Sequence, residues 1–186
     1  MLDSEEPRAM RELKVDPAEL ETAFDYAAWE RAYYLDVETC EVIMISDEIR
    51  GELERLYEEL GGESEIQPDA LAEALQQRDL PEWRRRALQE ADQVKAGYGT
   101  RYLRVPTADS HEGYGDMEDF IATVRDERLQ DGLWRAIRGR GAFRYFKDVL
   151  SDYPHERERW FKFKDAQVRQ RVLDWLESEG IKPIMD

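Results

Sequence analysis

The sequence predicts an α+β protein that is mostly helical, with a small antiparallel sheet built around an N-terminal β-hairpin. Residues 33–37 and 42–45, YYLDV and VIMI, are aromatic and β-branched and are separated by a turn-length spacer. That pattern is typical of two strands joined in a hairpin. Along most of the remaining chain, apolar residues recur three and four positions apart, which is the spacing of amphipathic helices.

Residues typical of helix starts mark the first two helices. Asp16 is followed by Pro17, the order expected at the N-cap and first position of a helix. Ser46 or Asp47 follows the hairpin and would cap the next helix. In chain order, we expect a short strand at 13–15, a helix at 17–29, the hairpin at 33–46, helices at 47–60, 69–78 and 82–96, and a strand at 102–106 that could join the hairpin sheet.

The chain is expected to be helical after residue 109. Four apolar residues from Met117 to Val124 lie at i, i+3, i+4 and i+7, a helical stripe that would begin near Asp109 or Ser110. Leu129, Leu133 and Ile137 continue the pattern in a second helix. A third helix at 143–153 follows two glycines, and the final helices are expected at 155–178.

The domain organisation expected from length and composition is one globular unit, 1–186. A chain of 186 residues with 41% hydrophobic residues can bury a core without disulfides. Within the unit, an acidic α/β subdomain at 12–60 and a helical part at 69–180 would be joined by a linker at 61–68. This segment, GGESEIQP, combines two glycines with a proline.

The charge excludes some partners and leaves others open. The net charge is −16, and residues 1–96 carry 26 acidic and 11 basic side chains. Bulk binding to nucleic acid is therefore not expected, because phosphate is repelled at long range. A protein partner is compatible with this charge, and a specific nucleic acid or nucleotide stays open without support from the net charge. We expect no membrane partner, because no run approaches about 20 apolar residues.

The single cysteine predicts a reducing compartment. One thiol, Cys40, cannot form an intrachain disulfide. The N-terminus is acidic and lacks the apolar run of a secretory signal, so a cytoplasmic location is expected. Cys40 also stands in the hairpin turn, where glycine with positive φ is common.

Three segments taken together resemble a known family. They are YYLDVETCEVIMIS at 33–46, RYLRVPTADSHEGYGDMEDFI at 101–121, and GRGAFRYFKDVL at 139–150 followed by WFKF at 160–163. In this order they resemble an uncharacterised bacterial protein family of the UPF type, over nearly the whole chain. GAFRYFKD is the most specific piece, and Cys40 departs from an expected glycine. The resemblance implies a bacterial cytosolic origin and no assigned activity.

Motifs that carry chemistry are scarce in this sequence. The two histidines lie far apart, and the chain has no cysteine pair for zinc, no nucleophile elbow, no Walker A loop and no dinucleotide-binding glycine pattern. Cys40 lies between Glu38 and Glu41 rather than beside the basic group that a nucleophilic thiol needs. We therefore expect no catalytic residue, no cofactor and no metal, and interpret the chain as a non-enzymatic binding or interaction protein.

Three carboxylates form a weak alternative site. Glu112, Asp116 and Asp119 lie at i, i+4 and i+7, on one face of a helix. Such a set could serve acid–base chemistry or bind a divalent cation, which would make the protein a carboxylate-based enzyme. The alternative is a solvated face opposite the apolar stripe.

A basic segment is the strongest candidate for a binding site. Residues 135–147, RAIRGRGAFRYFK, contain five basic side chains and no acidic one. The glycines predict a turn before a helix whose first amides could bind an anion, such as the phosphate of a nucleotide or of RNA. The candidate residues are Arg140, Gly141, Arg144 and Lys147. The alternative is an internal clamp, in which these cations pair with acids of the same chain.

Overall fold

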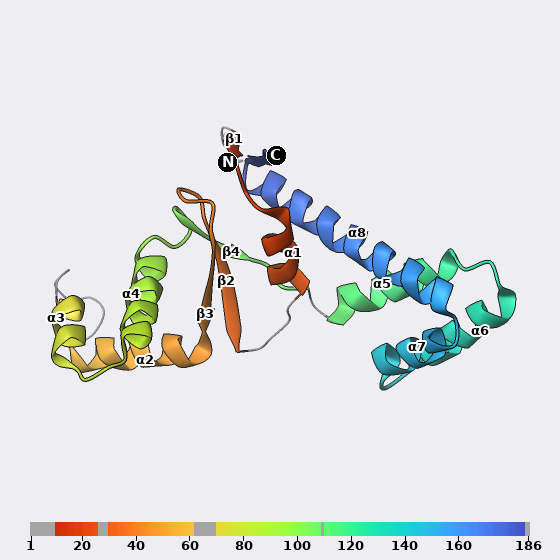
Figure 1. Ribbon diagram of the computed structural model, residues 1–186, viewed down its shortest axis with the longest axis horizontal. Helices are drawn as coiled ribbons and strands as arrows, with labels where there is room; N and C mark the ends of the chain where they lie inside the picture. Colours follow the sequence, from red (N-terminus) through yellow and green to blue (C-terminus); the bar gives the residue numbers. More distant parts are fainter. Residues whose placement is uncertain (1–9, 26–29, 62–69, 109, 185–186) are drawn as a thin grey trace, which may run out of the picture. The chain divides into compact units, whose positions relative to one another are not determined.

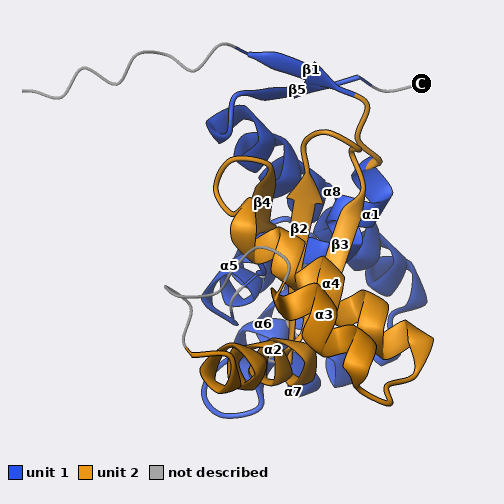
Figure 2. Cartoon of the chain, turned by 90° about the vertical axis from the view of Figure 1, so that its left-hand side faces the viewer, with its two compact units in different colours: residues 1–13, 17–27, 107–186 blue, residues 14–16, 28–106 orange. Residues whose placement is uncertain are grey.

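A computed structural model of the chain describes residues 10–25, 30–61, 70–108 and 110–184. These residues form eight helices and five strands, which confirms a mostly helical α+β fold. The chain divides into two compact units, coloured separately in Figure 2. Unit 1 comprises residues 1–13, 17–27 and 107–186, and unit 2 comprises residues 14–16 and 28–106.

Unit 2 contains the predicted hairpin sheet. Its strands are β2 (Arg31–Asp36), β3 (Val42–Ser46) and β4 (Tyr102–Val105), in the order β3-β2-β4 (Figure 1). Both pairings are antiparallel, and Tyr34 lies opposite Ile43 on one side and Arg104 on the other. The hairpin and the third strand that joins it are thus confirmed.

Three helices of unit 2 build a core with the sheet. They are α2 (Asp47–Glu59), α3 (Ala70–Gln77) and α4 (Glu82–Ala96). The Ser46 hydroxyl accepts a hydrogen bond from the Ile49 amide at 3.3 Å, which confirms the predicted cap of α2. Ile45 and Tyr102 of the sheet pack with Leu53 and Leu88 of the helices in one buried cluster. Helix packing therefore covers one face of the sheet.

Unit 1 is organised along one long helix. Its helices are α1 (Pro17–Asp25), α5 (Ser110–Ala122), α6 (Glu127–Ala136), α7 (Ala142–Ser151) and α8 (Pro154–Ser178). Helix α8 contacts α1, α5 and α7 (Figure 1). Phe120, Phe146, Trp160 and Phe163 form an aromatic core with ring centroids 4.8 to 6.2 Å apart. Among the described helices, α8 included, none is long and apolar enough to cross a bilayer.

Two expectations about the chain ends need correction. The strand expected at 13–15 is β1 (Arg11–Leu13), which pairs in parallel with β5 (Ile181–Pro183), a strand that the sequence did not predict. Each is only three residues long and its partner lies at the other end of the chain, so local periodicity carries no signal for the pair. The final helices expected at 155–178 are one continuous helix, α8.

The division into units falls outside the expected linker. Of that segment, 61–68, only Gly61 belongs to the described residues. Along the sequence the chain passes between the units at 13/14, 16/17, 27/28 and 106/107, so α3 and α4 share a unit with the hairpin, while α5 to α8 belong to unit 1.

Cys40 completes the hairpin turn with φ of +64°, the left-handed conformation anticipated for this position. Its amide donates to the carbonyl of Asp36 at 2.8 Å, and the Asp36 amide donates to the carbonyl of Glu41 at 3.0 Å. Glycine adopts this conformation without steric cost, whereas other L-residues do not. The turn therefore stores a small strain at Cys40.

A buried carboxylate fixes this turn to the adjacent strand. Asp36 is 2% exposed and accepts hydrogen bonds from the Glu38 amide at 2.9 Å and from Arg101 Nη2 at 2.7 Å. The Val37 amide in turn donates to the Arg101 carbonyl at 2.9 Å. Burial raises the pKa of Asp36, but the hydrogen bonds from Arg101, Glu38 and Thr39 outweigh it, so the net pKa lies below its ordinary value.

Replacing Cys40 by glycine should preserve or raise stability. The substitution relieves the positive-φ strain, and the gain of about 1 kcal/mol or less is offset in part by the greater freedom of glycine in the unfolded chain. Urea unfolding of Cys40→Gly against the wild type measures the difference. A loss of several kcal/mol would show that the Cys40 side chain itself holds the turn.

Replacing Asp36 by asparagine should lower the free energy of unfolding by about 1–2 kcal/mol at pH 7, because the partly exposed Arg101 loses the buried one of its two carboxylate partners, Asp36 and Glu38. Since the folded pKa of Asp36 is lowered, its contribution is present above the unfolded pKa and disappears as the pH falls through the folded value. The difference in free energy of unfolding between wild type and Asp36→Asn should therefore become smaller below about pH 4. Urea unfolding across pH 3–7 checks this, and a gap that stays constant down to pH 3 would contradict it.

Candidate functional site

The basic segment forms the turn between α6 and α7. Gly139 and Gly141 both have positive φ, +95° and +83°, and Gly141 is the N-cap of α7. The first turn of α7 has no acidic residue and no side-chain cap. The sequence anticipated this turn and helix start, because two glycines interrupt the apolar pattern there. The N-terminus of α7 is thus without a negative side chain of its own.

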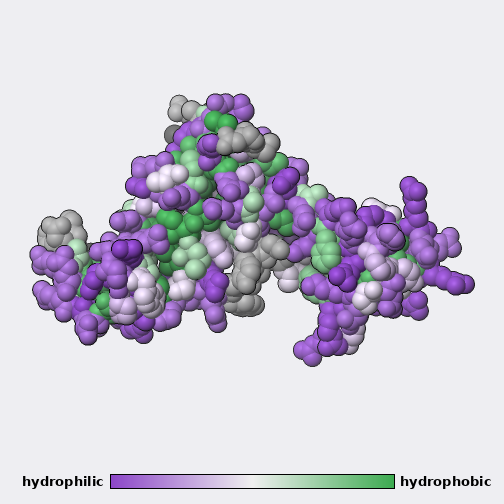
Figure 3. Space-filling model, viewed as in Figure 1, coloured by the Kyte–Doolittle hydropathy of each residue, from purple (hydrophilic) through white to green (hydrophobic). Residues whose placement is uncertain are grey.

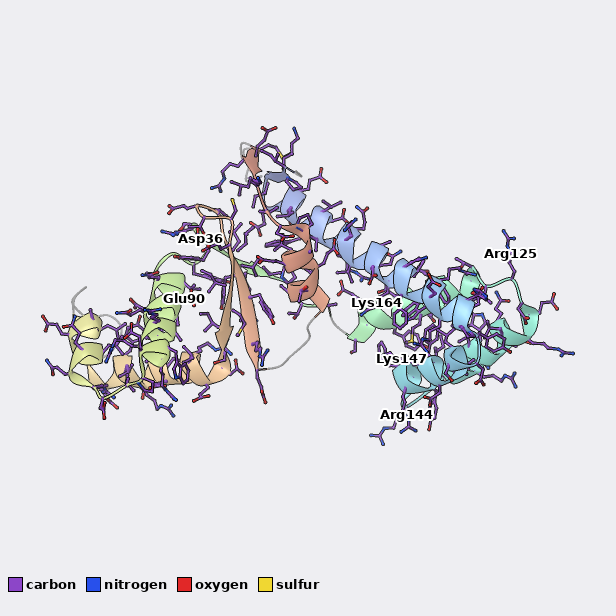
Figure 4. All side chains as sticks on the ribbon, in the orientation of Figure 1. Asp36, Glu90, Arg125, Arg144, Lys147 and Lys164 are labelled. Atoms are coloured by element: carbon purple, nitrogen blue, oxygen red, sulfur yellow. The ribbon has the colours of Figure 1, made fainter. Side chains whose placement is uncertain are left out.

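The cations of this segment point into solvent. Arg140, Arg144 and Lys147 are exposed, and none of them forms an ion pair with an acidic side chain in the described part of the chain. Figure 4 labels Arg144 and Lys147 on α7. The Arg144 guanidinium lies 4.9 Å from the centre of the Tyr145 ring. That ring packs on the turn, because a Cβ at Gly141 would come within 3.1 Å of it. An internal clamp would need acidic partners for these cations, and the described residues offer none.

Exposed aromatic residues lie on α7 and on the next helix, α8. Phe143 and Tyr145 project from α7, and Phe161 projects from α8. Between the helices lies a pocket of about 230 Å³, here called the α7–α8 pocket. Its lining residues are Lys147, Leu150, Ser151, Arg157, Trp160 and Phe161. The pocket therefore places cations beside exposed rings.

Sequence reasoning missed the contribution of α8 to this surface. Arg157 lies 5.9 Å from the centre of the Phe161 ring. The sequence signal was weak, because adjacent residues such as Trp160 and Phe161 can both face a core, as Phe120 and Ile121 of α5 do. Residues 135–164 contain nine Lys or Arg and four Asp or Glu, so this segment is positively charged. Figure 3 shows mainly hydrophilic residues over α6 and α7.

The three candidate carboxylates do not converge on an open site. Asp116 is 5% exposed and its Oδ2 accepts from Arg171 Nη1 at 3.0 Å. The Nε atom of the same arginine lies 3.9 Å from Glu112 Oε1, while Asp119 is exposed to solvent. A guanidinium thus occupies the place where a cation would be bound. The described residues contain no group of three His, Cys, Asp or Glu side chains suited to hold a metal ion.

Comparison with known proteins places the chain among relatives of unassigned function. Residues 85–186 match the family described as "Uncharacterised protein family (UPF0158)". UPF0158 protein PA5073 of Pseudomonas aeruginosa is 29% identical over 94 residues, which is 50% of this chain and 61% of that protein. The chain thus spans less than two thirds of the relative's length. The segments at 101–121 and 139–150 fall inside the match to the family, and the hairpin segment at 33–46 falls outside it. No solved structure matches the chain.

Removing the exposed arginines should leave the fold intact. We expect Arg140→Ala and Arg144→Ala to change the free energy of unfolding by about 0.5 kcal/mol or less, as surface substitutions do. Arg171→Ala is the matched comparison and should cost about 2–4 kcal/mol, because it leaves the buried Asp116 carboxylate unpaired. Urea unfolding of the three variants measures both effects. Comparable losses at Arg140 and Arg171 would identify the basic segment as a structural clamp.

Proposed function

The chain belongs to the uncharacterised protein family UPF0158, whose description assigns no activity. From the chain's own residues, we propose that it is a non-enzymatic binding protein that recognises RNA phosphates through its basic segment. The observation that carries the proposal is the set of exposed cations Arg140, Arg144 and Lys147, which pair with no acidic side chain among the described residues and lie near exposed aromatic rings.

The missing ion pairs are informative in so acidic a chain. There are 43 acidic side chains for 27 basic ones, so partners are abundant. Other arginines use them. Within the described residues, arginines that form ion pairs include Arg50, Arg78, Arg84, Arg85, Arg86, Arg101, Arg159, Arg169 and Arg171. Three neighbouring cations that have no ion-pair partner in the described ranges, next to a turn with two glycines, favour an external anion.

The aromatic residues favour a single strand over a free phosphate ion. Unpaired bases stack on exposed rings, and each stacked base contributes about 1–3 kcal/mol. Phe161 beside Arg157, and Tyr145 beside Arg144, each combine a ring with a cation that could contact the adjoining phosphate. A base-paired duplex hides these base faces, so it should bind less tightly than a single strand.

The net charge limits the contact to short range. At physiological ionic strength the Debye length is about 8 Å, so distant acidic residues are largely screened once a strand lies on α7. The binding should still weaken with salt, because each phosphate neutralised releases counterions. Three cationic contacts predict a slope of about −2 for log K against log salt on a single strand.

Fluorescence anisotropy with a short labelled single-stranded RNA, at about 50 to 200 mM KCl, tests this function. The variant carrying Arg140→Gln, Arg144→Gln and Lys147→Gln should lose affinity by about tenfold or more and flatten the salt dependence. Arg125→Gln is the control, since Arg125 is an exposed arginine of the same unit outside the basic segment (Figure 4).

Two results would count against the proposal. One is an RNA affinity too weak to measure at the lowest salt concentration. The other is a loss in Arg125→Gln equal to that in the triple variant, because the binding would then depend on overall charge and not on this surface.

A further inference from the structure

Unit 2 contains a pocket that none of the sequence motifs indicated. It has a volume of about 290 Å³ and is formed by the sheet together with α2 and α4. Its lining residues are Tyr34, Ile45, Arg50, Leu53, Glu54, Ala91, Val94, Lys95, Tyr98 and Arg104. The volume is at the lower end for small-molecule sites, so it fits a ligand of one or two rings.

The interior of this pocket is apolar and aromatic. Ile45, Leu53 and Val94 are buried core residues whose side chains also line it. The rings of Tyr34 and Tyr98 meet edge to face, with centroids 6.3 Å apart and planes at 80°. Tyr98 remains 59% exposed. A large ring held at a pocket mouth in contact with water offers area that a ligand ring could cover.

The charged residues of the pocket favour an anion. Arg50, Lys95 and Arg104 line it, against the single carboxylate of Glu54. Arg50 forms an ion pair with Asp47, and the Lys95 ammonium lies 4.2 Å from the centre of the Tyr57 ring. The third cation, Arg104, has no such contact among the described residues.

Arg104 is exposed on β4 opposite Tyr34, and its guanidinium pairs with no acidic side chain among the described residues. Its strand position fixes the direction of the side chain, because alternate residues of β4 face opposite sides of the sheet. Arg104 therefore points to the side on which Tyr34 lies. A planar guanidinium suits a bidentate contact with a carboxylate or a similar oxyanion.

We propose that this pocket binds a small aromatic anion, with its ring against Tyr34, Tyr98 and Val94 and its anionic group on Arg104. The interior supplies contact area, and the cation supplies orientation and selectivity for the charge. The proposal is independent of RNA binding, since it concerns other residues in the other unit.

The charge selectivity can be tested with three matched probes. Naphthalene-1-acetate has both the ring and the anion, 1-naphthylmethylamine has the same ring with a cation, and acetate has the anion alone. NMR titration of the full chain should show saturable binding of naphthalene-1-acetate, with shifts of Tyr34 and Tyr98. The other two probes should bind about tenfold more weakly or worse, a difference of about 1.4 kcal/mol.

Variants then assign the binding to the pocket. Arg104→Gln and Tyr98→Ala should each weaken naphthalene-1-acetate binding by about tenfold. Arg55→Gln is the control, because Arg55 is an exposed residue of α2 that does not line the pocket. Unchanged melting temperatures confirm that the variants fold. Equal binding of the amine and the acetate derivative, no saturable binding of either, or an equal loss in Arg55→Gln would overturn the proposal.

Discussion

The ion pair between the buried Asp36 carboxylate and the partly exposed Arg101 is the constraint on which the sheet of unit 2 depends. Asp36 ends β2, and Arg101 immediately precedes β4, so the pair sets the end of one strand against the start of the other. Side chains alternate along a strand, so a register slip of one residue would turn every side chain to the opposite face. With the register fixed at Leu35 opposite Leu103, Tyr34 and Arg104 share the face that carries the pocket. The pocket therefore depends on a carboxylate that does not line it.

A comparable pair organises unit 1, with a different consequence. Arg171 of α8 pairs with Asp116 of α5, and the buried carboxylate would be costly without it. The pair holds two helices together and, at the same time, uses the carboxylate that the helical spacing suggested for chemistry. Spacing along one helix could show that Glu112 and Asp116 share a face, but it could not show which other helix that face meets. The same pattern therefore fits an enzyme site and an internal ion pair equally well until the packing is known.

The sequence predicted the elements whose signal is local. Periodicity identified the helices, the Ser46 cap was readable from its position, and a glycine-like turn position was recognisable even though Cys40 occupies it. What could not be predicted depends on residues far apart: β1 with β5 at opposite ends of the chain, and Asp36 with Arg101, 65 residues apart. The candidate site divides in the same way. The turn and the start of α7 followed from two glycines, whereas the contribution of Arg157 and Phe161 depends on how α7 and α8 pack.

The arginines of this protein differ in what they contribute to the stability of the fold. Arg101 and Arg171 offset buried carboxylates, so each contributes to folding. Arg104 and Arg144 are exposed and hydrated, so the fold neither gains nor loses much through them. Each nevertheless lies near a tyrosine, Arg104 opposite Tyr34 in the sheet and Arg144 against the Tyr145 ring. At Arg144 the Tyr145 ring restricts the guanidinium without neutralising it, which lowers the entropy lost when an anion binds. The surrounding acidic residues act in the opposite direction at long range and oppose indiscriminate binding of polyanions. Selectivity for an anionic ligand thus requires close contact at these few positions.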